Sequence, residues 1–339
     1  MGEALAQHPP SMFIYENEHH NWTGRTDPED GALAVRWHHR VRRIEPGQAR
    51  QPLPALVGFA CDAGVARNQG RRGAAAGPVV LRRALANLAW RHETPGVWDF
   101  GDVRCHGDAL ETAQEALAST VAVMLEEGHR PVVLGGGHET AYGSFGGLDR
   151  WARGARPDAR IGILNLDAHF DLRRVGAAGP SSGTPFGQIH DDLTERGAPF
   201  RYACVGISRT ANTAALFERA AATGTRWRLD EDCTVRHLDA TLAFVSDFVA
   251  ECDLVHLTLD LDVLPGAVMP AVSAPAPRGV PLEVIEAVID RVLAARGPQG
   301  PKLALADLAE LNPAVDPQGL GARVAALLCD RLVGSSPVP

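Results

Sequence analysis

Acidic and histidine side chains gather at three points of the sequence, each where an apolar run ends. The motifs are Gly135-Gly136-Gly137-His138, Asp167-Ala168-His169-Phe170-Asp171 and Asp260-Leu261-Asp262. Carboxylate oxygens with a minority of imidazole nitrogens form the ligand set expected for Mn²⁺ and similar ions. Six such side chains suffice for two ions if some carboxylates bridge, and two bridged cations bind and deprotonate a water. The three motifs therefore predict hydrolysis at neutral pH.

Two of these motifs place their charged residues two positions apart. Alternate residues of an extended segment point to one side, so the charged residues of each motif can converge. A lone histidine such as His138 is more typical of an ordinary hydrogen-bonding residue at a strand end. A polar strand end can also simply face solvent, but the run GILNL before Asp167 has the character of a buried strand. Three separate matches favour a metal site over these plainer interpretations.

The elements that must position these motifs alternate along the chain from residue 55. Short apolar runs predict strands at 55–60, 131–134, 160–166, 202–207, 253–260 and 302–309. Apolar residues at three- and four-residue spacing predict helices at 78–91, 109–127, 139–153, 211–222, 236–251, 281–296 and 318–333. Continuous apolar runs indicate strands buried on both faces, as in a parallel sheet covered by helices. Ligands of such sheets bind beyond the carboxyl ends of the strands, where all three motifs fall.

The chain divides into two parts of different composition. Residues 1–54 are polar and rich in His, Pro and charged residues, and we expect an extended or partly helical N-terminal arm. Residues 55–335 are expected to form a single α/β catalytic domain. The Pro- and Gly-rich stretches 175–187 and 264–281 predict long loops over the site.

The bulk composition narrows the class of protein. A chain of 339 residues with 45% hydrophobic content can bury a large core, and a net charge of −8 argues against nucleic-acid and anionic-membrane partners. Six scattered cysteines without a C-x-x-C pair favour buried thiols in a reducing cytoplasm. No signal peptide is evident, and no apolar run approaches a membrane span. We therefore expect a cytoplasmic protein acting on a small molecule.

In their order and spacing the three motifs resemble the arginase/agmatinase (ureohydrolase) superfamily of dimanganese amidine hydrolases, over nearly the whole chain. The resemblance implies a three-layer α/β/α sandwich around a mainly parallel, eight-stranded sheet, a homo-oligomer, and two Mn²⁺ per subunit. It implies that the first Mn²⁺ is held by His138, Asp167, Asp171 and Asp260. It implies that the second is held by Asp167, His169, Asp260 and Asp262. Asp167 and Asp260 would then bridge the two ions.

Further stretches narrow the resemblance to the formimidoylglutamases. In the loop 181–186, Ser182 stands where arginases and agmatinases carry the histidine of a His-Gly pair. The stretches 22–27, 36–38, 58–65, 67–74 and 206–213 also look like that branch. The implied reaction is hydrolysis of N-formimidoyl-L-glutamate to L-glutamate and formamide, the last step of one histidine-degradation route. A metal-bridging hydroxide would attack the amidine carbon.

A dicarboxylate substrate of this kind requires hydrogen-bond donors. Arginine forks bind carboxylates in a bidentate manner, although a loop arginine can equally be a solvated residue. Hydroxyl, amide and backbone donors could add to them. The candidates for substrate binding are Asn68, Arg71, Arg72, Ser182, Gly183, Thr184, Arg209, Asn212 and Glu310.

Two carboxylates are candidates for catalysis. By the resemblance, Asp171 would take the hydroxide proton and pass it to the leaving nitrogen. Glu310 matches the superfamily glutamate that orients the amidine, and a carboxylate can accept both N–H groups of a planar amidinium. It could instead be a carboxylate stabilised at a helix N-terminus. Two alternatives stay open: another ureohydrolase, guanidinobutyrase- or agmatinase-like, that releases urea from a guanidino acid, and a metal-binding scaffold without turnover.

Overall fold

A nine-stranded sheet forms the centre of the molecule, described by a computed structural model over residues 22–44 and 51–334. Every pair of neighbouring strands is parallel, in the order β1-β3-β2-β4-β11-β8-β5-β6-β7. The strands are β1 (Val41–Arg43), β2 (Pro54–Ala60), β3 (Val97–Arg104), β4 (Arg130–Leu134), β5 (Ile161–Leu166), β6 (Tyr202–Ile207), β7 (Arg226–Leu229), β8 (Leu254–Asp260) and β11 (Leu303–Ala309). A small antiparallel hairpin joins β9 (Arg296–Gly297) and β10 (Gly300–Pro301).

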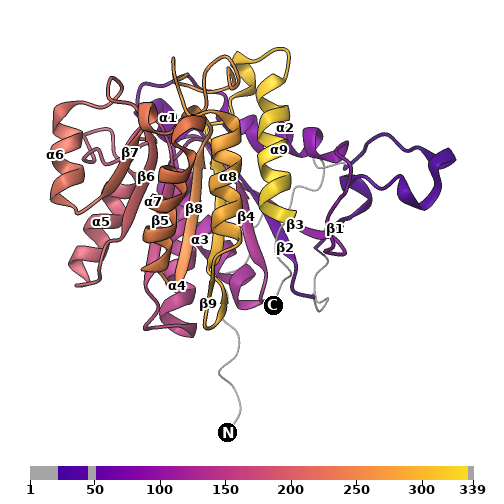
Figure 1. Cartoon of the computed structure of the whole chain (residues 1–339), viewed down its shortest axis with the longest axis horizontal. Helices are drawn as coiled ribbons and strands as arrows, with labels where there is room; N and C mark the ends of the chain where they lie inside the picture. The colour runs from indigo at the N-terminus through magenta and orange to yellow at the C-terminus, as the bar shows by residue number, and fades with distance from the viewer. Residues whose placement is uncertain (1–21, 45–50, 335–339) are drawn as a thin grey trace, which may run out of the picture.

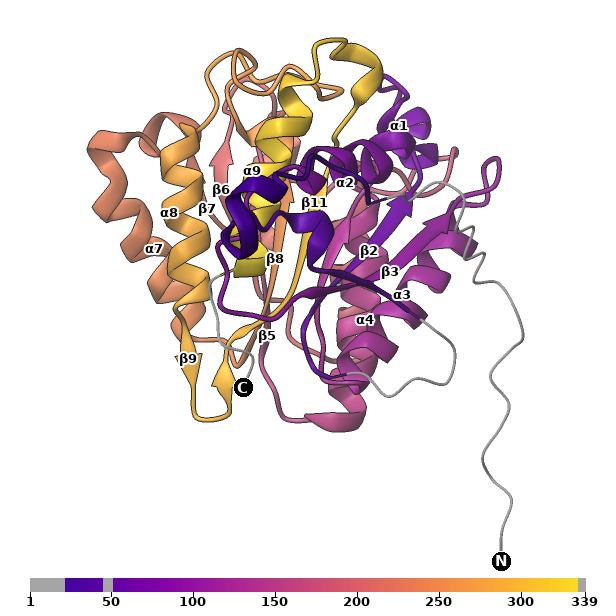
Figure 2. The same cartoon turned by 90° about the vertical axis from the view of Figure 1, so that its right-hand side faces the viewer.

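Helices cover both faces of the sheet (Figures 1 and 2). One layer contains α2 (Gly77–Ala86), α7 (Leu238–Ala250), α8 (Leu282–Leu293) and α9 (Leu320–Gly334). The other contains α3 (Leu110–Glu126), α4 (Thr140–Ala155) and α5 (Pro185–Glu195), with α6 (Ala214–Ala222) beside the β6–β7 edge. The remaining elements are α1 (Ala63–Arg67) and the 3₁₀ turns η1 (Pro28–Leu33), η2 (Trp37–His39), η3 (Ala74–Ala76), η4 (Asp230–Asp232), η5 (Val235–His237), η6 (Leu261–Val263) and η7 (Pro313–Val315).

The central strands are buried along their whole length, as the continuous apolar runs predict. All residues of β6 and β8 are buried, and alternate side chains pack into different cores. Leu257 and Leu259 of β8 belong to the core beneath α7, α8 and α9, so His256 and Thr258 face the layer of α4. The predicted three-layer α/β/α class is confirmed.

Three details differ from the prediction. The sheet has nine strands instead of eight, because Val41–Arg43, from the segment expected to be an arm, pairs with β3 at the edge. The strands β3 and β7 were not predicted, because charged residues interrupt their apolar pattern. The helix α5 begins at Pro185, inside the expected loop 175–187, where proline suits the first helical turn.

The described N-terminal segment 22–44 is attached to the body by two tryptophans. Trp37 is fully buried and donates its Nε1–H to Asp330 Oδ1 at 2.5 Å, and Trp22 donates to Asp99 Oδ2 at 2.7 Å. The part around η1 projects from the body (Figure 1). The rest of the expected arm, 1–21 and 45–50, lies outside the described residues.

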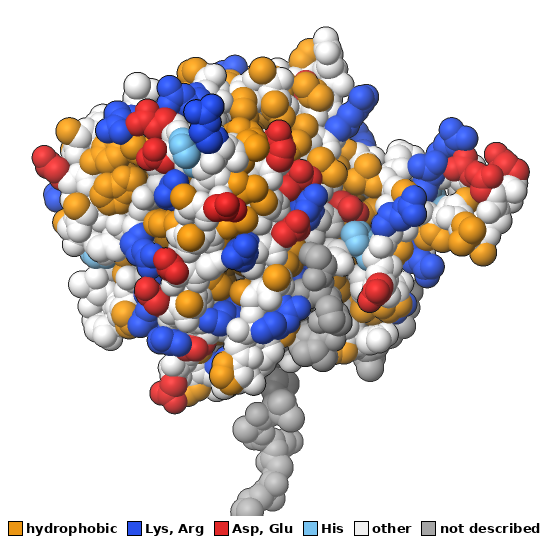
Figure 3. All heavy atoms as spheres, in the orientation of Figure 1, with side chains coloured by type: hydrophobic (Ala, Val, Ile, Leu, Met, Phe, Trp, Pro, Cys, Tyr) orange, Lys and Arg blue, Asp and Glu red, His pale blue; other side chains and the backbone are white. Residues whose placement is uncertain are grey.

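The surface and the cysteines complete the description. The face shown in Figure 3 intersperses Lys and Arg with Asp and Glu side chains. All six cysteines are free. Among the described residues, no helix is both long and apolar enough to cross a membrane.

Candidate metal centre and active-site cavity

Four adjacent strands at the centre of the sheet deliver the predicted site residues. The order β4-β11-β8-β5 places the four carboxyl ends side by side. His138 follows β4, Asp167 follows β5, and Glu310 follows β11, while Asp260 ends β8 with Asp262 two residues on. Because neighbouring parallel strands end at the same edge, motifs separated by more than a hundred residues meet there.

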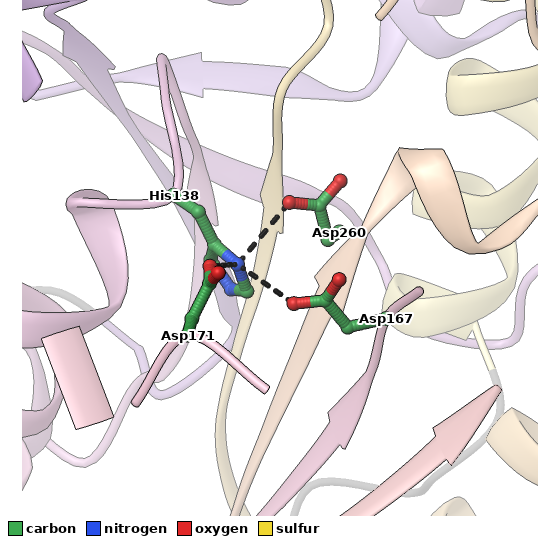
Figure 4. Close-up of side chains that lie close together, drawn as sticks. All are labelled: His138, Asp167, Asp171 and Asp260. Atoms are coloured by element: carbon green, nitrogen blue, oxygen red, sulfur yellow. Dashed lines mark hydrogen bonds and ion pairs between the residues drawn. The ribbon is translucent and has the colours of Figure 1, made fainter. Parts of the chain in front are cut away.

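The first group of converging side chains is centred on the ring of His138 (Figure 4). His138 Nδ1 lies 2.9 Å from Asp171 Oδ2, 3.2 Å from Asp167 Oδ2 and 3.2 Å from Asp260 Oδ2. One ligand atom from each of the four residues lies within 4.8 Å of the others. One imidazole nitrogen surrounded by three carboxylate oxygens has the composition of a coordination shell for a hard divalent cation.

A second group shares one carboxylate with the first. His169 Nδ1 lies 3.0 Å from Asp262 Oδ2 and 3.5 Å from Asp167 Oδ1, and these three residues also converge within 4.8 Å. Asp167 thus offers one oxygen to each group. Asp260 accepts a hydrogen bond from the backbone N–H of Asp262 at 2.8 Å, which ties the two carboxylates of the third motif together. The structure therefore brings all six predicted ligands into two adjoining groups.

The second nitrogen of the His138 ring shows that the first group fits a metal. His138 Nε2 lies 2.9 Å from the hydroxyl of Thr258. When that hydroxyl accepts the Nε2–H, the lone pair of Nδ1 faces three carboxylate oxygens. A lone pair and three anions repel one another without a cation between them. A histidine ligand normally has its other ring N–H engaged in this way.

The electrostatics of the cluster point in the same direction. Burial, followed by the charges of Asp262 and Asp167, raises the pKa of Asp260 well above its ordinary value. Without a metal ion, a proton at Nδ1 takes the place of the cation: burial lowers the pKa of His138, but hydrogen bonds with three aspartates outweigh burial and raise that pKa well above its usual range. Four carboxylates against two imidazoles leave an excess of buried negative charge. Bound divalent cations would neutralise it.

A cavity of about 390 Å³ opens above the two groups and exposes His169, Asp171, Asp260, Asp262 and Glu310. Its lining includes Gln69, Asp171 and Glu310, whose φ angles are 62°, 47° and 68°. Among the described residues these three are the non-glycine residues with positive φ. Such left-handed backbone is strained for residues with a Cβ and concentrates at functional sites. The strain here is confined to one cavity.

Glu310 lines this cavity and has one carboxylate oxygen without a hydrogen-bond partner. Its Oε1 accepts the backbone N–H of His138 at 3.0 Å, whereas its buried Oε2 has no hydrogen-bond partner. Burial, followed by the charge of Glu139, raises the pKa of Glu310 to about 8. A buried acceptor without a partner is costly unless a ligand satisfies it. Glu310 therefore has the geometry of a substrate-binding carboxylate.

Besides Glu310, four of the predicted substrate-binding residues line the cavity: Asn68, Arg71, Ser182 and Asn212. The Arg71 guanidinium donates to the carbonyls of Val272 at 2.8 Å and Ser273 at 3.0 Å. The Asn212 side chain bonds the backbone of Ala168 and Phe170, so it shapes the Asp-x-His-x-Asp loop. Asn68 donates to the Ser182 hydroxyl at 3.1 Å.

The other four predicted substrate-binding residues lie outside the cavity lining. The side chain of Arg72 is 62% exposed and sits 3.8 Å from Asp62, and that of Arg209 is 63% exposed and pairs with Glu231. Thr184 donates its hydroxyl to the carbonyl of Ser181 and shapes the turn before α5. Gly183 accepts the backbone N–H of Arg173 at 2.9 Å.

Sequence reasoning did not name Arg173, which lines the cavity. A Cβ built on Gly183 would lie 2.8 Å from Arg173 Cδ, so the arginine side chain passes directly over this glycine. Its guanidinium pairs with no other side chain among the described residues. The two-residue spacing that relates Asp167, His169 and Asp171 extends to Arg173, and this spacing was the signal that could have found it.

Comparisons with known proteins identify the class of this protein. The family model for the arginase family matches residues 54–334. The chain belongs to the arginase family and is an enzyme of the hydrolase class. It is 56% identical to a formimidoylglutamase of Ralstonia nicotianae, over 92% of this chain and 94% of that protein. It is 52% identical to one of Aeromonas salmonicida, over 92% and 96%. The predicted resemblance to formimidoylglutamases is confirmed.

Solved structures agree with this assignment. The Trypanosoma cruzi formiminoglutamase crystallised with Mn²⁺ superposes with a TM-score of 0.70 at 25% identity, covering 85% of this chain and 94% of that one. A Bacillus subtilis formimidoylglutamase gives a TM-score of 0.76 at 19% identity, covering 92% and 93%, and supports the fold.

Proposed function

We propose that this enzyme is a formimidoylglutamase that hydrolyses N-formimidoyl-L-glutamate to L-glutamate and formamide in histidine degradation. The observation that carries the proposal is the cavity itself, which is lined by Glu310, by Arg173 and by four of the six converging metal-ligand side chains, with His138 and Asp167 buried directly behind them. The names of relatives about half identical over nine-tenths of the chain support the choice of substrate.

The proposed cofactor is a pair of Mn²⁺ ions per subunit. His138, Asp167, Asp171 and Asp260 would hold one ion, and Asp167, His169, Asp260 and Asp262 the other. The carboxylate-rich donor set and the Mn²⁺ of the Trypanosoma cruzi structure support this ion. When bound, the ions supply Lewis acidity and an activated water.

Glu310 is proposed to orient the reacting group. An amidinium is planar and donates N–H groups in its plane, and Glu310 Oε2 is free to accept one of them. The Oε1 atom stays fixed by the backbone of His138, so the carboxylate is held in place without using its free oxygen. The amidine carbon would thereby be presented to the floor of the cavity.

Asp171 is proposed to move the proton. Its carboxylate borders the cavity, and its Oδ2 atom is 2.9 Å from His138 Nδ1. A carboxylate in this position can take a proton from the attacking water and return it to the leaving α-amino nitrogen. Its left-handed backbone, with φ 47°, is held in place because the Asp171 carbonyl accepts the backbone N–H of Phe186 at 3.3 Å.

Arg173 is proposed to bind a carboxylate of the substrate. The guanidinium of Arg71 is already engaged by two backbone carbonyls, and Arg72 and Arg209 lie outside the cavity. Arg173 is the exposed arginine of the lining whose guanidinium has no partner within the described chain. Guanidinium forks match carboxylates in geometry and charge.

Product analysis of the Mn²⁺-loaded protein tests the proposal. The enzyme would be offered N-formimidoyl-L-glutamate, agmatine, guanidinobutyrate and arginine in parallel. Formamide and glutamate from the first substrate alone is the expected result. Urea from any other substrate would contradict the proposed specificity. A correctly folded protein that hydrolyses none of the four compounds would be a metal-binding scaffold instead of an enzyme of this kind.

A further inference from the structure

A row of buried polar side chains lies in the sheet directly beneath the proposed metal ligands. Asn165 of β5 and Asp307 of β11 are both paired in register with Thr258 of β8. Paired residues of parallel strands share a face, so the three side chains lie next to one another, and all are fully buried. Burying polar groups inside a sheet is unfavourable unless hydrogen bonds compensate. Their presence in an otherwise apolar layer requires a reason.

Two members of the row contact ligands above them. Thr258 Oγ1 lies 2.9 Å from Nε2 of His138, and Asn165 Nδ2 donates to Oδ2 of Asp167 at 2.9 Å. Each contact reaches the ligand from the side opposite the cavity. The row therefore holds the ligands from below.

The third member of the row, Asp307, is bonded to a buried histidine deeper in the core. His256, two residues before Thr258, places its Nε2 atom 2.6 Å from Asp307 Oδ2 and stacks on Phe145 of α4 at 6.5 Å. Asp307 Oδ1 is buried without a hydrogen-bond partner, and Asp307 lies in register beside Thr258. Burial opposes the ionised form of Asp307, but the charge and hydrogen bond of His256 lower the pKa of Asp307 below its ordinary value. The unpaired oxygen of Asp307 is therefore an acceptor available to the hydroxyl proton of Thr258.

We propose that Thr258, Asp307 and His256 form a hydrogen-bonded relay that fixes the His138 ring with Nδ1 as its metal-binding atom. A threonine hydroxyl has one proton and two lone pairs. Because the proton is directed to Asp307, a lone pair accepts Nε2–H of His138, and this selects the tautomer whose Nδ1 is unprotonated. These are positioning residues, and the inference rests on the proposed metal site.

The test is a titration of the full chain with Mn²⁺, in which the EPR signal of free Mn²⁺ measures how much is bound. Thr258→Val keeps the shape and removes the hydroxyl, and we expect one of the two sites to weaken by about 10- to 100-fold. Thr258→Ser restores the hydroxyl and should bind within a few-fold of the wild type. Asp307→Asn removes the charge that orients the hydroxyl, and the same site should weaken.

Thr120→Val is the matched control. Thr120 is buried in α3, and its hydroxyl donates to the carbonyl of Ala116 at 2.8 Å, so this variant also loses a buried hydroxyl. It should lower the thermal midpoint of the metal-free protein without changing Mn²⁺ affinity.

If Thr258→Val also lowered the thermal midpoint but left the Mn²⁺ affinity of both sites unchanged, the proposed relay would be wrong. A wild-type protein that binds no Mn²⁺ would instead contradict the proposed function, so the two failures are distinguishable.

Discussion

Replacement of Arg173 by methionine tests how this cavity selects its substrate. Methionine keeps most of the length and apolar stem of the side chain and removes the guanidinium. A hydrogen bond to a charged group contributes about 1.5–3 kcal/mol, and each 1.4 kcal/mol is about a factor of ten. Because Arg173 is exposed at the rim, the loss in kcat/KM should lie toward the lower end, at about 10- to 100-fold. Most of it should appear as a higher KM, as for an interaction present equally in substrate and transition state.

The assay compares substrates that differ in their carboxylates. Formamide release would be measured with N-formimidoyl-L-glutamate, with N-formimidoyl-L-glutamine, and with formamidine, which has no carboxylate. The loss caused by Arg173→Met should be large for the first and absent for formamidine. Its size with the glutamine compound shows which carboxylate is bound, because that compound lacks only the side-chain charge.

Two further variants make the result specific. Arg72→Met removes an arginine that is 62% exposed and outside the cavity, and it should leave kcat/KM within about twofold. Gly183→Ala places a methyl group against Arg173 Cδ, so it should reproduce part of the loss while keeping the charge. An equal loss on formamidine, or no loss on the dicarboxylate, would refute the role of Arg173.

The remaining predictions concern the metal groups and the core. Asp260→Asn should bind fewer than two Mn²⁺ per chain and lack turnover, and two bound ions would contradict the role of Asp260 as a ligand. The metal-free variant should unfold at a higher temperature than the metal-free wild type, because one buried repelling charge is removed. Glu310→Gln should raise KM and lower kcat together in steady-state kinetics, and unchanged kinetics would make Glu310 structural. Mn²⁺ at about a thousand times its Kd stabilises the folded protein by about 4 kcal/mol per site, and 339 residues give an unfolding entropy near 0.7 kcal/mol/K. Removing the metal with a chelator should therefore lower the thermal midpoint by about 6 °C per site. A midpoint that does not change with chelator would exclude metal-linked stability. Arg82→Met should lose about 3–5 kcal/mol by urea unfolding, because it removes the buried guanidinium that neutralises the carboxylates of Asp99 and Asp102. Recovery in the Arg82→Met/Asp99→Asn/Asp102→Asn variant would identify charge as the cause.

The metal groups could be predicted from sequence because each motif is local. The stretch from Asp167 to Asp171 follows one apolar strand, and its spacing alone indicates convergence. The order of the strands is not local. That β8 and β11 lie between β4 and β5 depends on how distant segments pack, and no residue near His138 records it. The sequence places all three motifs at strand carboxyl ends, whereas the assignment of the six ligands to two ions rested on the family resemblance. The observed strand order shows why the motifs meet.

The arginines show why substrate contacts were harder to predict. In the sequence, Arg71, Arg72 and Arg209 are each an arginine in a turn after a predicted strand, so the sequence does not distinguish them. Their partners separate them: backbone carbonyls engage Arg71, and Glu231 holds Arg209 at the surface. Arg173 qualifies because no side chain of the described chain pairs with it. A guanidinium is available to substrate only if nothing else satisfies it, and this depends on tertiary contacts.

The same dependence on the surrounding structure explains the backbone of the cavity. Left-handed conformations at Gln69, Asp171 and Glu310 are each unfavourable by about 1–3 kcal/mol, a large sum against a typical stability of about 5–15 kcal/mol. None of the three is a glycine, so the sequence gives no sign of these conformations. They persist because rigid elements hold the chain on either side: Glu310 N–H bonds Gly136 O at 2.7 Å, and Phe186 N–H bonds Asp171 O at 3.3 Å. The buried sheet thus supplies the stability that keeps two candidate catalytic carboxylates in conformations they would not adopt alone. The positions under strain are the ones that line the cavity.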